Sequence, residues 1–478
     1  MLGFIKKIIP RRLFSFLQPP YHFLLAWLAA FVYGFPSNRL IVIGVTGTAG
    51  KTSTAYLVAK MLTSAGYKSG LSSTAVLSDG HKEWLNNKKM TMPGRFFIQK
   101  FLKEMADNGC SYAVVETTSE GIRQFRHRFI NYDVLIFTGL YPEHIESHGS
   151  FAKYKATKEL LFSHLHRCRV KYVDEQKLVV KPQSELRKLD LHRVKKTIIV
   201  NGDDEYAFDF LDFWSEVKSV YSFNPEINLE NFYQKLDKTV LLQNFNFLSG
   251  QIIKADISGT LVNLGGQDMQ LKLLGSFNAY NAAAAYAVGV SQDLKIEEIK
   301  SALEQITSLA GKMEMIKVGQ DFTVLVDYSF EPRALEKLYE TISLIPYNRL
   351  IHVLGSTGGG RDVSRRPVLG RLAAEKADIV IITNEDPYDE DPVQIINQVS
   401  AGAEMVGKTI NNDLFKILDR QEAIKKAVVL AKSNNLVLVT GKGAEQYICM
   451  AGGRKLPWDD REIVRQALVD KLCVDKQQ

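Results

Sequence analysis

The sequence has few cysteines, no long apolar run and only a small charge surplus. Its four cysteines, Cys110, Cys168, Cys449 and Cys473, include no C-x-x-C pair, which excludes a disulfide framework and the usual zinc-binding spacings. Such cysteine usage fits a reducing compartment, so we expect a cytoplasmic protein. The net charge is +7, and five of the surplus positive charges lie in residues 1–39. Because the remainder is nearly neutral, the charge gives no sign of nucleic-acid binding.

The rest of the composition is that of a folded globular protein. A hydrophobic share of 46% and a charged share of 24% exclude a disordered or collagen-like chain. At about 150 residues per domain, a chain of 478 residues is expected to form two to four domains. The sequence contains no repeat with a period of about 20–50 residues and no low-complexity tract.

The N-terminal segment is basic and hydrophobic. The pairs Lys6–Lys7 and Arg11–Arg12 precede an uncharged, aromatic-rich run over 21–35, which is bounded by Pro19–Pro20 and by Pro36. This run is shorter than the roughly 20 apolar residues that a membrane-spanning helix needs. A glycine-rich loop of the phosphate-binding type follows within ten residues. It argues against a secretory signal, because ATP chemistry belongs in the cytoplasm. Two interpretations remain: a helix packed on the protein's own surface, or an interfacial helix that makes peripheral membrane contact through residues 1–37.

From residue 40 onward, short apolar runs alternate with helical patterns, which is typical of α/β proteins with parallel sheets. A first series of predicted strands lies at 39–45, 111–116, 133–140 and 197–201, with helices at 53–66 and 96–109. Residues 225–275 change character and predict antiparallel strands. A second series of strands lies at 322–328, 349–355, 377–383 and 435–441. We therefore expect an N-terminal segment over 1–38, a P-loop parallel-sheet ATPase domain over 39–308 and a Rossmann-like α/β domain over 309–478.

The string TGTAGKT at 46–52 is the strongest single motif. A strand runs into a glycine-rich turn, and a helix follows whose first turn carries Lys51 and Thr52. Backbone N–H groups of such a turn and the helix N-terminus bind phosphate oxygens. Lys51 would bridge the β- and γ-phosphates of ATP, and Thr52 would bind Mg²⁺. Val45 stands where the strict GxxxxGK[ST] motif has its first glycine. The predicted ATP contacts in this loop are Gly47, Thr48, Ala49, Gly50, Lys51 and Thr52.

Further polar residues follow the neighbouring strands. Glu116 ends one predicted strand, and an acid at this edge of the sheet is a natural magnesium ligand. His144 lies just past the next strand and is a predicted ligand at the same edge, with His148 as a second candidate. Lys158 lies on a helix predicted over 149–162, where a solvated charge would be the ordinary interpretation.

These segments resemble the Mur ligase family, and most closely its UDP-N-acetylmuramoyl-tripeptide synthetase (MurE-type) branch. TGTAGKT resembles the family's P-loop, and ETTSEGIRQFR at 116–126 resembles its E-x-S-S-H-x-x-x-Q-x-R segment. The histidine and lysine segment at 142–162 is similar to the family's R-D-H-x-D-x-H-G…K-x-x-L-F. Further similar segments follow in the family's order at 273–285, 311–316, 326–335, 360–367, 385–392 and 441–445. The resemblance covers residues 40–465.

The resemblance implies an ATP-dependent ligase that forms an amide bond. A carboxylate attacks the γ-phosphate of ATP to give an acyl phosphate, which the amine of an amino acid then displaces. It also implies two Mg²⁺ ions, one held by Thr52 and Glu116, the other by His144 and a CO₂-derived carbamate on Lys158. Lys51, Glu116, His144 and Lys158 are the implied catalytic residues. The implied ATP contacts outside the loop are Asn278, Asn281, Lys312 (where the family has arginine) and Asp327.

The sequence also departs from the family's pattern. Only about 40 residues precede the P-loop, so the family's uridine-binding domain is missing from this sequence. Tyr388 replaces an arginine that diaminopimelate enzymes use to bind a carboxylate, so we do not expect that substrate. The acids Glu385, Asp386 and Asp389 instead suit a basic amino acid such as lysine. The implied acceptor residues are Thr91, Pro93, Thr118, Ser119, Gln124 and Arg126. Those on the amino-acid side are Arg361, Glu385, Asp386, Tyr388, Gly441 and Glu445.

The leading hypothesis is a ligase that adds a free amino acid to a muramoyl-peptide precursor in peptidoglycan synthesis. One alternative is the same chemistry on another acceptor, such as a lipid-linked precursor, folate or a cyanophycin-type peptide. Gln124 and Arg126 favour a muramoyl acceptor, whereas the missing uridine-binding domain favours a lipid-linked or non-nucleotide one. A second alternative is a non-catalytic P-loop module. The joint presence of Lys51, Glu116, His144 and Lys158 argues against it.

Overall fold

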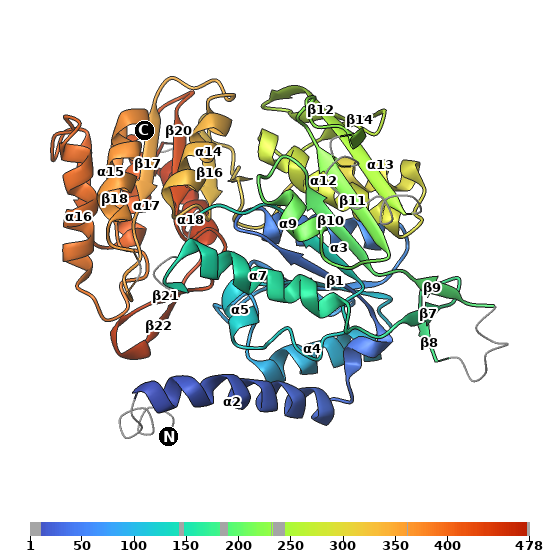
Figure 1. The fold of residues 1–478 in the computed structure, drawn as a ribbon. Helices are drawn as coiled ribbons and strands as arrows, with labels where there is room; N and C mark the ends of the chain where they lie inside the picture. The colour runs from blue at the N-terminus through green and yellow to red at the C-terminus, as the bar shows by residue number, and fades with distance from the viewer. Residues whose placement is uncertain are drawn as a thin grey trace.

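The computed structural model describes residues 11–142, 148–181, 190–230, 232, 244–360 and 362–475. Two large sheets, each covered by helices on both faces, lie side by side (Figure 1). One is formed by strands between residues 41 and 271, and the other by strands between residues 314 and 440. The fold class predicted from the sequence is therefore confirmed.

The first sheet has eleven strands in the order β14-β13-β12-β11-β10-β6-β1-β5-β2-β3-β4. Its bounds are β1 (Ile41–Thr46), β2 (Ser69–Ser72), β3 (Val76–Ser78), β4 (Glu83–Leu85), β5 (Tyr112–Glu116), β6 (Val134–Phe137), β10 (Thr197–Asn201), β11 (Val217–Ser222), β12 (Phe245–Asp256), β13 (Gly259–Leu264) and β14 (Gln267–Leu271). Strands β2, β5, β1, β6, β10, β11 and the start of β12 pair in parallel. As predicted for 225–275, β12, β13 and β14 form an antiparallel meander. A small separate sheet contains β7 (Lys171–Val173), β8 (Val179–Val180) and β9 (His192–Val194).

Strand β1 lies at the centre of this sheet and is buried on both faces, as expected for a continuous apolar run. Ile41, Ile43 and Val45 pack with one set of helices, α3 (Lys51–Ser64), α12 (Ser276–Ser291) and α13 (Ile296–Gln305). Val42 faces the opposite set, α4 (Arg95–Asp107), α5 (Ser119–Arg123), α7 (Phe151–Leu165) and α9 (Ala207–Leu211). The loop after β1 is therefore held by a core on either side.

The second sheet has six strands in the order β15-β16-β20-β17-β18-β19. Its bounds are β15 (Glu314–Met315), β16 (Thr323–Asp327), β17 (Leu350–Leu354), β18 (Ile379–Thr383), β19 (Leu414–Ile417) and β20 (Leu436–Thr440). All pairs except β15–β16 are parallel. One face packs against α14 (Pro332–Ile342), α15 (Arg365–Lys376) and α16 (Pro392–Glu404), the other against α17 (Arg420–Leu430) and α18 (Asp460–Asp475). A short hairpin of β21 (Tyr447–Cys449) and β22 (Lys455–Pro457) encloses the one-turn helix η2 (Ala451–Gly453).

The N-terminal segment forms a long helix, α2 (Arg11–Val32), which is followed by the short helix η1 (Pro36–Arg39). Pro19 and Pro20, which bound the apolar run in the sequence, do not interrupt the helix, because α2 continues through both of them. Each proline removes one backbone donor, but packing of Ala26, Ala29 and Ala30 against the body of the protein holds the helix. Helix α2 runs alongside α4 at the lower edge of the molecule (Figure 1). None of the described helices is both long enough and apolar enough to cross a bilayer.

Candidate active site

The loop between β1 and α3 adopts a backbone that only glycine fits at two positions. Gly47 has φ +154°, and a Cβ there would lie 2.0 Å from Thr138 Oγ1. Gly50 has φ +78° and directly precedes α3, and its Cβ would lie 2.7 Å from Asn281 Oδ1. These close approaches fix the loop against β6 and α12. The free N–H groups of the first turn of α3 therefore lie at the carboxyl edge of the sheet, where a helix N-terminus binds anions.

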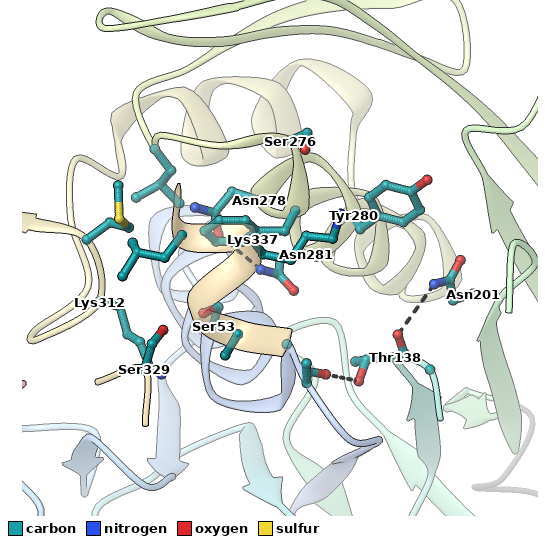
Figure 2. A pocket seen from close by; sticks show the side chains of 18 of the residues that line it. Ser53, Thr138, Asn201, Ser276, Asn278, Tyr280, Asn281, Lys312, Ser329 and Lys337 are labelled. Carbon is teal, nitrogen blue, oxygen red and sulfur yellow. Dashed lines mark hydrogen bonds between the residues drawn. The ribbon is translucent and has the colours of Figure 1, made fainter. Parts of the chain in front are cut away.

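Hydrogen bonds hold this loop in shape. The Thr48 N–H donates to Gly139 O at 2.8 Å, and Thr138 Oγ1 donates to Ala49 O at 2.6 Å (Figure 2). Lys51 Nζ donates to Thr48 O at 2.7 Å. The cation of Lys51 is thus held over the loop that would surround the phosphates.

Oxygen ligands for a cation come from the first turn of α3 and from the end of the neighbouring strand β5. Thr52 Oγ1 lies 3.0 and 3.1 Å from the two carboxylate oxygens of Glu116, which ends β5 and is 1% exposed. Glu116 also accepts from the backbone N–H of Thr74 at 2.7 Å. A carboxylate beside a hydroxyl fits Mg²⁺, which prefers oxygen ligands and completes its shell with phosphate and water. In the described part of the chain, no three His, Cys, Asp or Glu side chains gather as a complete metal cage, so nucleotide oxygens would have to supply the remaining ligands.

Lys158 reaches the loop from α7. Its Nζ donates to Gly47 O at 2.6 Å, and the side chain is 1% exposed. It also lies 4.8 Å from the centre of the Tyr154 ring, whose hydroxyl is 3.2 Å from Thr48 Oγ1. Lys158 is therefore not the solvated charge that an isolated lysine on a helix would suggest. Its amine lies beside the phosphate-binding loop.

Of the two predicted histidines, the structure describes His148. His144 lies outside the described residues. His148 Nε2 is 3.1 Å from Ser119 Oγ, and its ring contacts Tyr154 edge to face. His148 thus connects the region around Lys158 with Ser119, one of the predicted acceptor residues.

A cavity of 620 Å³ lies between the two sheets (Figure 2). The first domain contributes Gly50, Asn278 and Asn281, and the second contributes Lys312 and Asp327. Asn281 donates to Asn278 Oδ1 at 3.0 Å and accepts from Thr54 Oγ1 at 3.2 Å, so both amides are held in place. All four predicted nucleotide contacts outside the loop therefore line one cavity beside it.

Asp327 ends β16 and fixes the wall of this cavity on the C-terminal side. It accepts from the N–H of Met313 at 2.8 Å and from the N–H of Ser329 at 2.7 Å. Lys312 lies 4.6 Å from the centre of the Tyr328 ring. The cavity wall thus combines a cation with a fixed carboxylate, a pairing suited to a phosphate and a ribose.

The predicted acceptor residues form a second cluster, next to Glu116. Thr91 Oγ1 lies 2.7 Å from Thr74 Oγ1, which itself lies 3.0 Å from Glu116. Gln124 Oε1 accepts from Arg126 at 2.7 Å. Thr118 caps the N-terminus of α5 by accepting from the N–H of Gly121 at 3.2 Å. Pro93 and Ser119 are both buried. In the sequence, Pro93 is two residues from Thr91 and Ser119 directly follows Thr118.

The predicted amino-acid side is built on an ion network between the domains. Lys442 Nζ lies 3.0 Å from both carboxylate oxygens of Asp386 and also donates to Glu445. Lys89, from the loop between β4 and α4, donates to Asp386 and Glu445 at 2.8 Å each. Because Lys89 is two residues from Thr91, this network brings the amino-acid side next to the acceptor cluster.

The acids that suggested a basic amino acid already have partners within the chain. Asp386 is paired with Lys442 and Lys89, and burial would raise its pKa, but these two cations outweigh burial and lower it. Asp389 accepts from the N–H of Gly452 at 2.8 Å. The charge-based reason to expect lysine as the substrate is therefore weakened.

Glu385 is the exception, because one of its carboxylate oxygens is buried and has no hydrogen-bond partner among the described residues. Burial raises the pKa of Glu385 to about 7, although the nearby Arg420 cation opposes the shift. A carboxyl whose folded pKa exceeds its unfolded pKa stabilises the fold at low pH. That stability is lost as the pH rises between about 4.5 and 7.

Replacing Glu385 by glutamine is therefore expected to raise the thermal midpoint above that of the parent at pH 8. The free energy of unfolding at pH 8 is expected to rise by on the order of 2–3 kcal/mol, because glutamine removes the cost of ionising a carboxyl whose pKa is raised in the folded state. At pH 5 both side chains are neutral in the folded state, and the difference should become small. Thermal unfolding of both proteins at the two pH values checks this, and a gain independent of pH would contradict it.

Gly441 and Tyr388, two further predicted residues on the amino-acid side, lie close to Glu385 and Asp386. Gly441 has φ +106°, and a Cβ there would lie 2.5 Å from Glu385 Oε2. Tyr388 is half-buried, and burial together with the Asp386 carboxylate raises the pKa of its hydroxyl to about 12. Arg361 lies outside the described residues.

Sequence reasoning missed four residues of this region: Thr74, Lys89, Thr138 and Lys442. Lys442 lies inside the GKGAE segment, so that motif could have identified it. Thr138 follows β6, and the rule that polar residues gather at the ends of parallel strands could have found it. Thr74 and Lys89 lie in irregular loops, and no sequence signal singles them out.

Comparisons with known proteins agree on one family. The model of the Mur ligase middle domain matches residues 45–289, and that of the Mur ligase glutamate ligase domain matches residues 311–443. The chain is 34% identical over 452 residues to a UDP-N-acetylmuramyl-tripeptide synthetase of Roseiflexus sp. (strain RS-1). That alignment covers 93% of this chain and 82% of the relative.

Solved structures give the same picture for the fold. A UDP-N-acetylmuramoyl-L-alanyl-D-glutamate–2,6-diaminopimelate ligase matches with a TM-score of 0.56 and 23% identity, over 91% of this chain and 79% of that one. The folylpolyglutamate synthase of Mycobacterium tuberculosis matches with a TM-score of 0.58 and 15% identity, over 94% and 95% of the two chains.

Proposed function

Since the chain belongs to the Mur ligase family and is an ATP-dependent ligase, we propose that it joins a free amino acid to the carboxylate of a muramoyl-peptide precursor in peptidoglycan synthesis. One observation carries this proposal. The phosphate loop, the Thr52–Glu116 pair, the Lys158 amine and the acceptor cluster around Thr91 are linked by direct contacts at one sheet edge. A binding module for nucleotide alone would not need the last two.

The reaction we propose has two steps. An acceptor carboxylate oxygen attacks the γ-phosphorus of ATP, ADP leaves, and an acyl phosphate forms. The amine of the amino acid then attacks the acyl carbon, the C–O bond to phosphate breaks, and inorganic phosphate leaves as the amide forms. The first step brings anions together, so it needs fixed positive charge at the phosphates.

The residues of this chain are suited to that need. Lys51 and the N-terminus of α3 lie at the phosphate loop, where they would stabilise charge on the transferring group. Thr52 and Glu116 would hold Mg²⁺, which supplies further neutralisation of phosphate charge when bound. Asn278, Asn281, Lys312 and Asp327 line the adjoining cavity and would hold the nucleoside. Because these contacts come from both domains, closure of the domains would complete the site.

Lys158 has a separate role in the proposal. Its amine is buried against the Gly47 carbonyl, close to where the γ-phosphate would lie. The Lys158 ammonium would first lose one proton to give the neutral amine. The amine nitrogen would then attack CO₂, an N–C bond would form, and a second proton would leave, so that the cation becomes a carbamate anion. Such an anion, together with His144, is suited to bind a second Mg²⁺ beside the acceptor.

Residues of the acceptor cluster and of the amino-acid side bear on which acceptor and which amino acid the protein uses. Gln124 and Arg126 are held together next to the acceptor cluster and favour a muramoyl-type acceptor. Diaminopimelate is disfavoured, because Tyr388 replaces the carboxylate-binding arginine. Since Lys89 and Lys442 already neutralise Asp386 and Glu445, we do not assign a basic amino acid either.

The amino-acid side can be tested by removing Lys89. We expect Lys89→Ala to lower the KM for L-lysine at least several-fold relative to L-alanine, because Asp386 and Glu445 then lack one cation. Measuring KM for both amino acids in parent and variant checks this. The control is Lys82→Ala, which removes an exposed lysine seven residues before Lys89 in the chain. An equal change for both amino acids would contradict a charge-specific role.

The function itself is tested with the purified chain, ATP, Mg²⁺ and a panel of UDP-linked and lipid-linked muramoyl dipeptides crossed with amino acids. We expect phosphate release that depends on both partners, and a product mass equal to acceptor plus amino acid minus water. ATP binding without any coupled product across the panel would instead favour the non-catalytic module. Coupling only to folate or to a cyanophycin-type peptide would assign the same chemistry to another acceptor.

A further inference from the structure

Helix α2 presents an apolar face to solvent. Ala26, Ala29 and Ala30 recur at helical spacing and are buried against the protein. The opposite face carries Leu17, Tyr21, Leu24, Leu28, Phe31 and Val32, of which Leu24 and Phe31 are each 60% exposed. Monomeric proteins seldom expose so continuous an apolar stripe, and such a surface marks an interaction site.

The chemistry of this helix matches a bilayer surface. Residues 13–38 contain no Asp, Glu, Lys or Arg, whereas Arg11 and Arg12 begin the helix and Lys6 and Lys7 precede it in the sequence. Trp27 and Phe31 stack with ring centres 5.3 Å apart on the outer side. An apolar face with an aromatic pair and adjacent basic residues is typical of helices that lie in the headgroup region of a membrane.

A second feature lies beside α2. A cavity of 320 Å³ is lined by Phe23, Phe35 and Phe129 together with Arg128, Arg167 and Arg169. Within the part of the chain that the structure describes, none of the three arginines has an ion-pair partner. Burial and the nearby Arg167 cation lower the pKa of Arg128, as expected where like charges gather. Three arginines among aromatic rings form a site for an anionic phosphate that has an apolar tail.

We propose that α2 and the adjoining arginine cavity dock the protein on the surface of an anionic phospholipid bilayer. The exposed face of α2 inserts among the acyl chains near the headgroups. The cavity formed by Arg128, Arg167 and Arg169 binds the phosphate of a lipid headgroup. Both features belong to one surface, because Phe23 of α2 also lines the cavity.

With the exposed face of α2 in the bilayer, the predicted acceptor residues lie near the lipid headgroups. Phe23 contacts Phe125 and Phe129 with ring centres 6.3 and 5.2 Å apart. Phe125 lies between Gln124 and Arg126 in the chain. If the proposed function holds, on which this step rests, the acceptor is a muramoyl peptide carried on a membrane lipid.

The docking is tested by co-sedimentation of the full chain with vesicles of phosphatidylglycerol and phosphatidylcholine. We expect the parent to bind them, and the double variant Leu24→Ser/Phe31→Ser to bind at least tenfold less. The parent should prefer the vesicles that contain phosphatidylglycerol over vesicles of pure phosphatidylcholine, and the double variant Arg167→Glu/Arg169→Glu should lose this preference. Raising the salt from about 0.1 M to about 1 M should weaken parent binding, because the Debye length falls from about 10 Å to about 3 Å. Met405→Ser/Val429→Ser removes apolar side chains that are at least as exposed, far from α2, and should change nothing.

Three outcomes would overturn the proposal: no vesicle binding by the parent, equal loss in the Met405→Ser/Val429→Ser control, or a dimer in light scattering that Leu24→Ser/Phe31→Ser dissolves. The last would assign the face to a second copy of the chain. Vesicle binding does not depend on turnover, so failure of the ligase proposal would leave this test intact. Use of UDP-linked acceptors alone, with vesicle binding intact, would refute only the membrane-borne acceptor.

Discussion

Replacing Lys51 by alanine is expected to lower kcat/KM for ATP-dependent ligation by at least about 100-fold, on the order of 3–4 kcal/mol of lost transition-state stabilisation. The Lys51 amine is held over the phosphate loop by Thr48 O, and no other side chain of that loop carries a positive charge. Charge that develops during phosphoryl transfer would therefore lose its main side-chain partner. Steady-state phosphate release in the presence of acceptor and amino acid measures the effect.

The matched control is Lys60→Ala on the same helix, α3. Lys60 forms a surface ion pair with Glu83, and both side chains are more than one-third exposed, so its loss should leave activity within about twofold. Thermal unfolding of both variants shows whether the fold is intact. A folded Lys51→Ala protein with near-normal turnover would exclude a catalytic role for this loop.

Replacing Lys158 by methionine is expected to abolish ligation. Methionine fills a similar buried volume, but it can neither donate a hydrogen bond to Gly47 O nor form a carbamate. Lys158→Ala should be equally inactive and partly regain turnover in acetate or formate, since a small carboxylate can enter the vacated space. The parent's intact mass in bicarbonate should exceed its ordinary mass by one CO₂ molecule. Turnover, rescue and mass together test the carbamate.

Lys155→Ala is the control for these variants. Lys155 lies on the same helix but pairs at the surface with Asp209 and Glu159, so its loss should change neither turnover nor mass. Inactive Lys158 variants without rescue by any small acid, together with an unmodified parent in bicarbonate, would refute the carbamate. A plain cation at this position would then explain the loss.

The fold was largely predictable because its signals are local. Buried parallel strands require continuous apolar runs, and these runs marked β1, β5, β6, β10, β16, β17, β18 and β20 within a few residues. The antiparallel meander was predicted from the change in pattern after residue 225. The extent of α2 was not, because tertiary packing of small residues overrode the helix-breaking tendency of Pro19 and Pro20.

The candidate site likewise contains residues that the sequence predicts and residues that it does not. Residues at strand ends and in the phosphate loop lie together because parallel strands bring their carboxyl ends to one edge, a rule that needs no coordinates. Lys89 and Thr74 could not be predicted, since they reach their partners from irregular loops. Lys89 changes the chemical conclusion as well. The sequence presents Asp386 as free to bind a basic substrate, whereas the folded chain pairs it with two lysines.

The central claim is that an acceptor carboxylate is activated as an acyl phosphate, and an isotope experiment tests it most directly. The acceptor is labelled with ¹⁸O in its reacting carboxylate and incubated with the protein, ATP, Mg²⁺ and the amino acid. Because the carboxylate oxygen that attacks the γ-phosphorus leaves with the phosphate, one ¹⁸O atom should appear in inorganic phosphate for each amide formed. Unlabelled phosphate, or label in AMP with release of pyrophosphate, would contradict this mechanism.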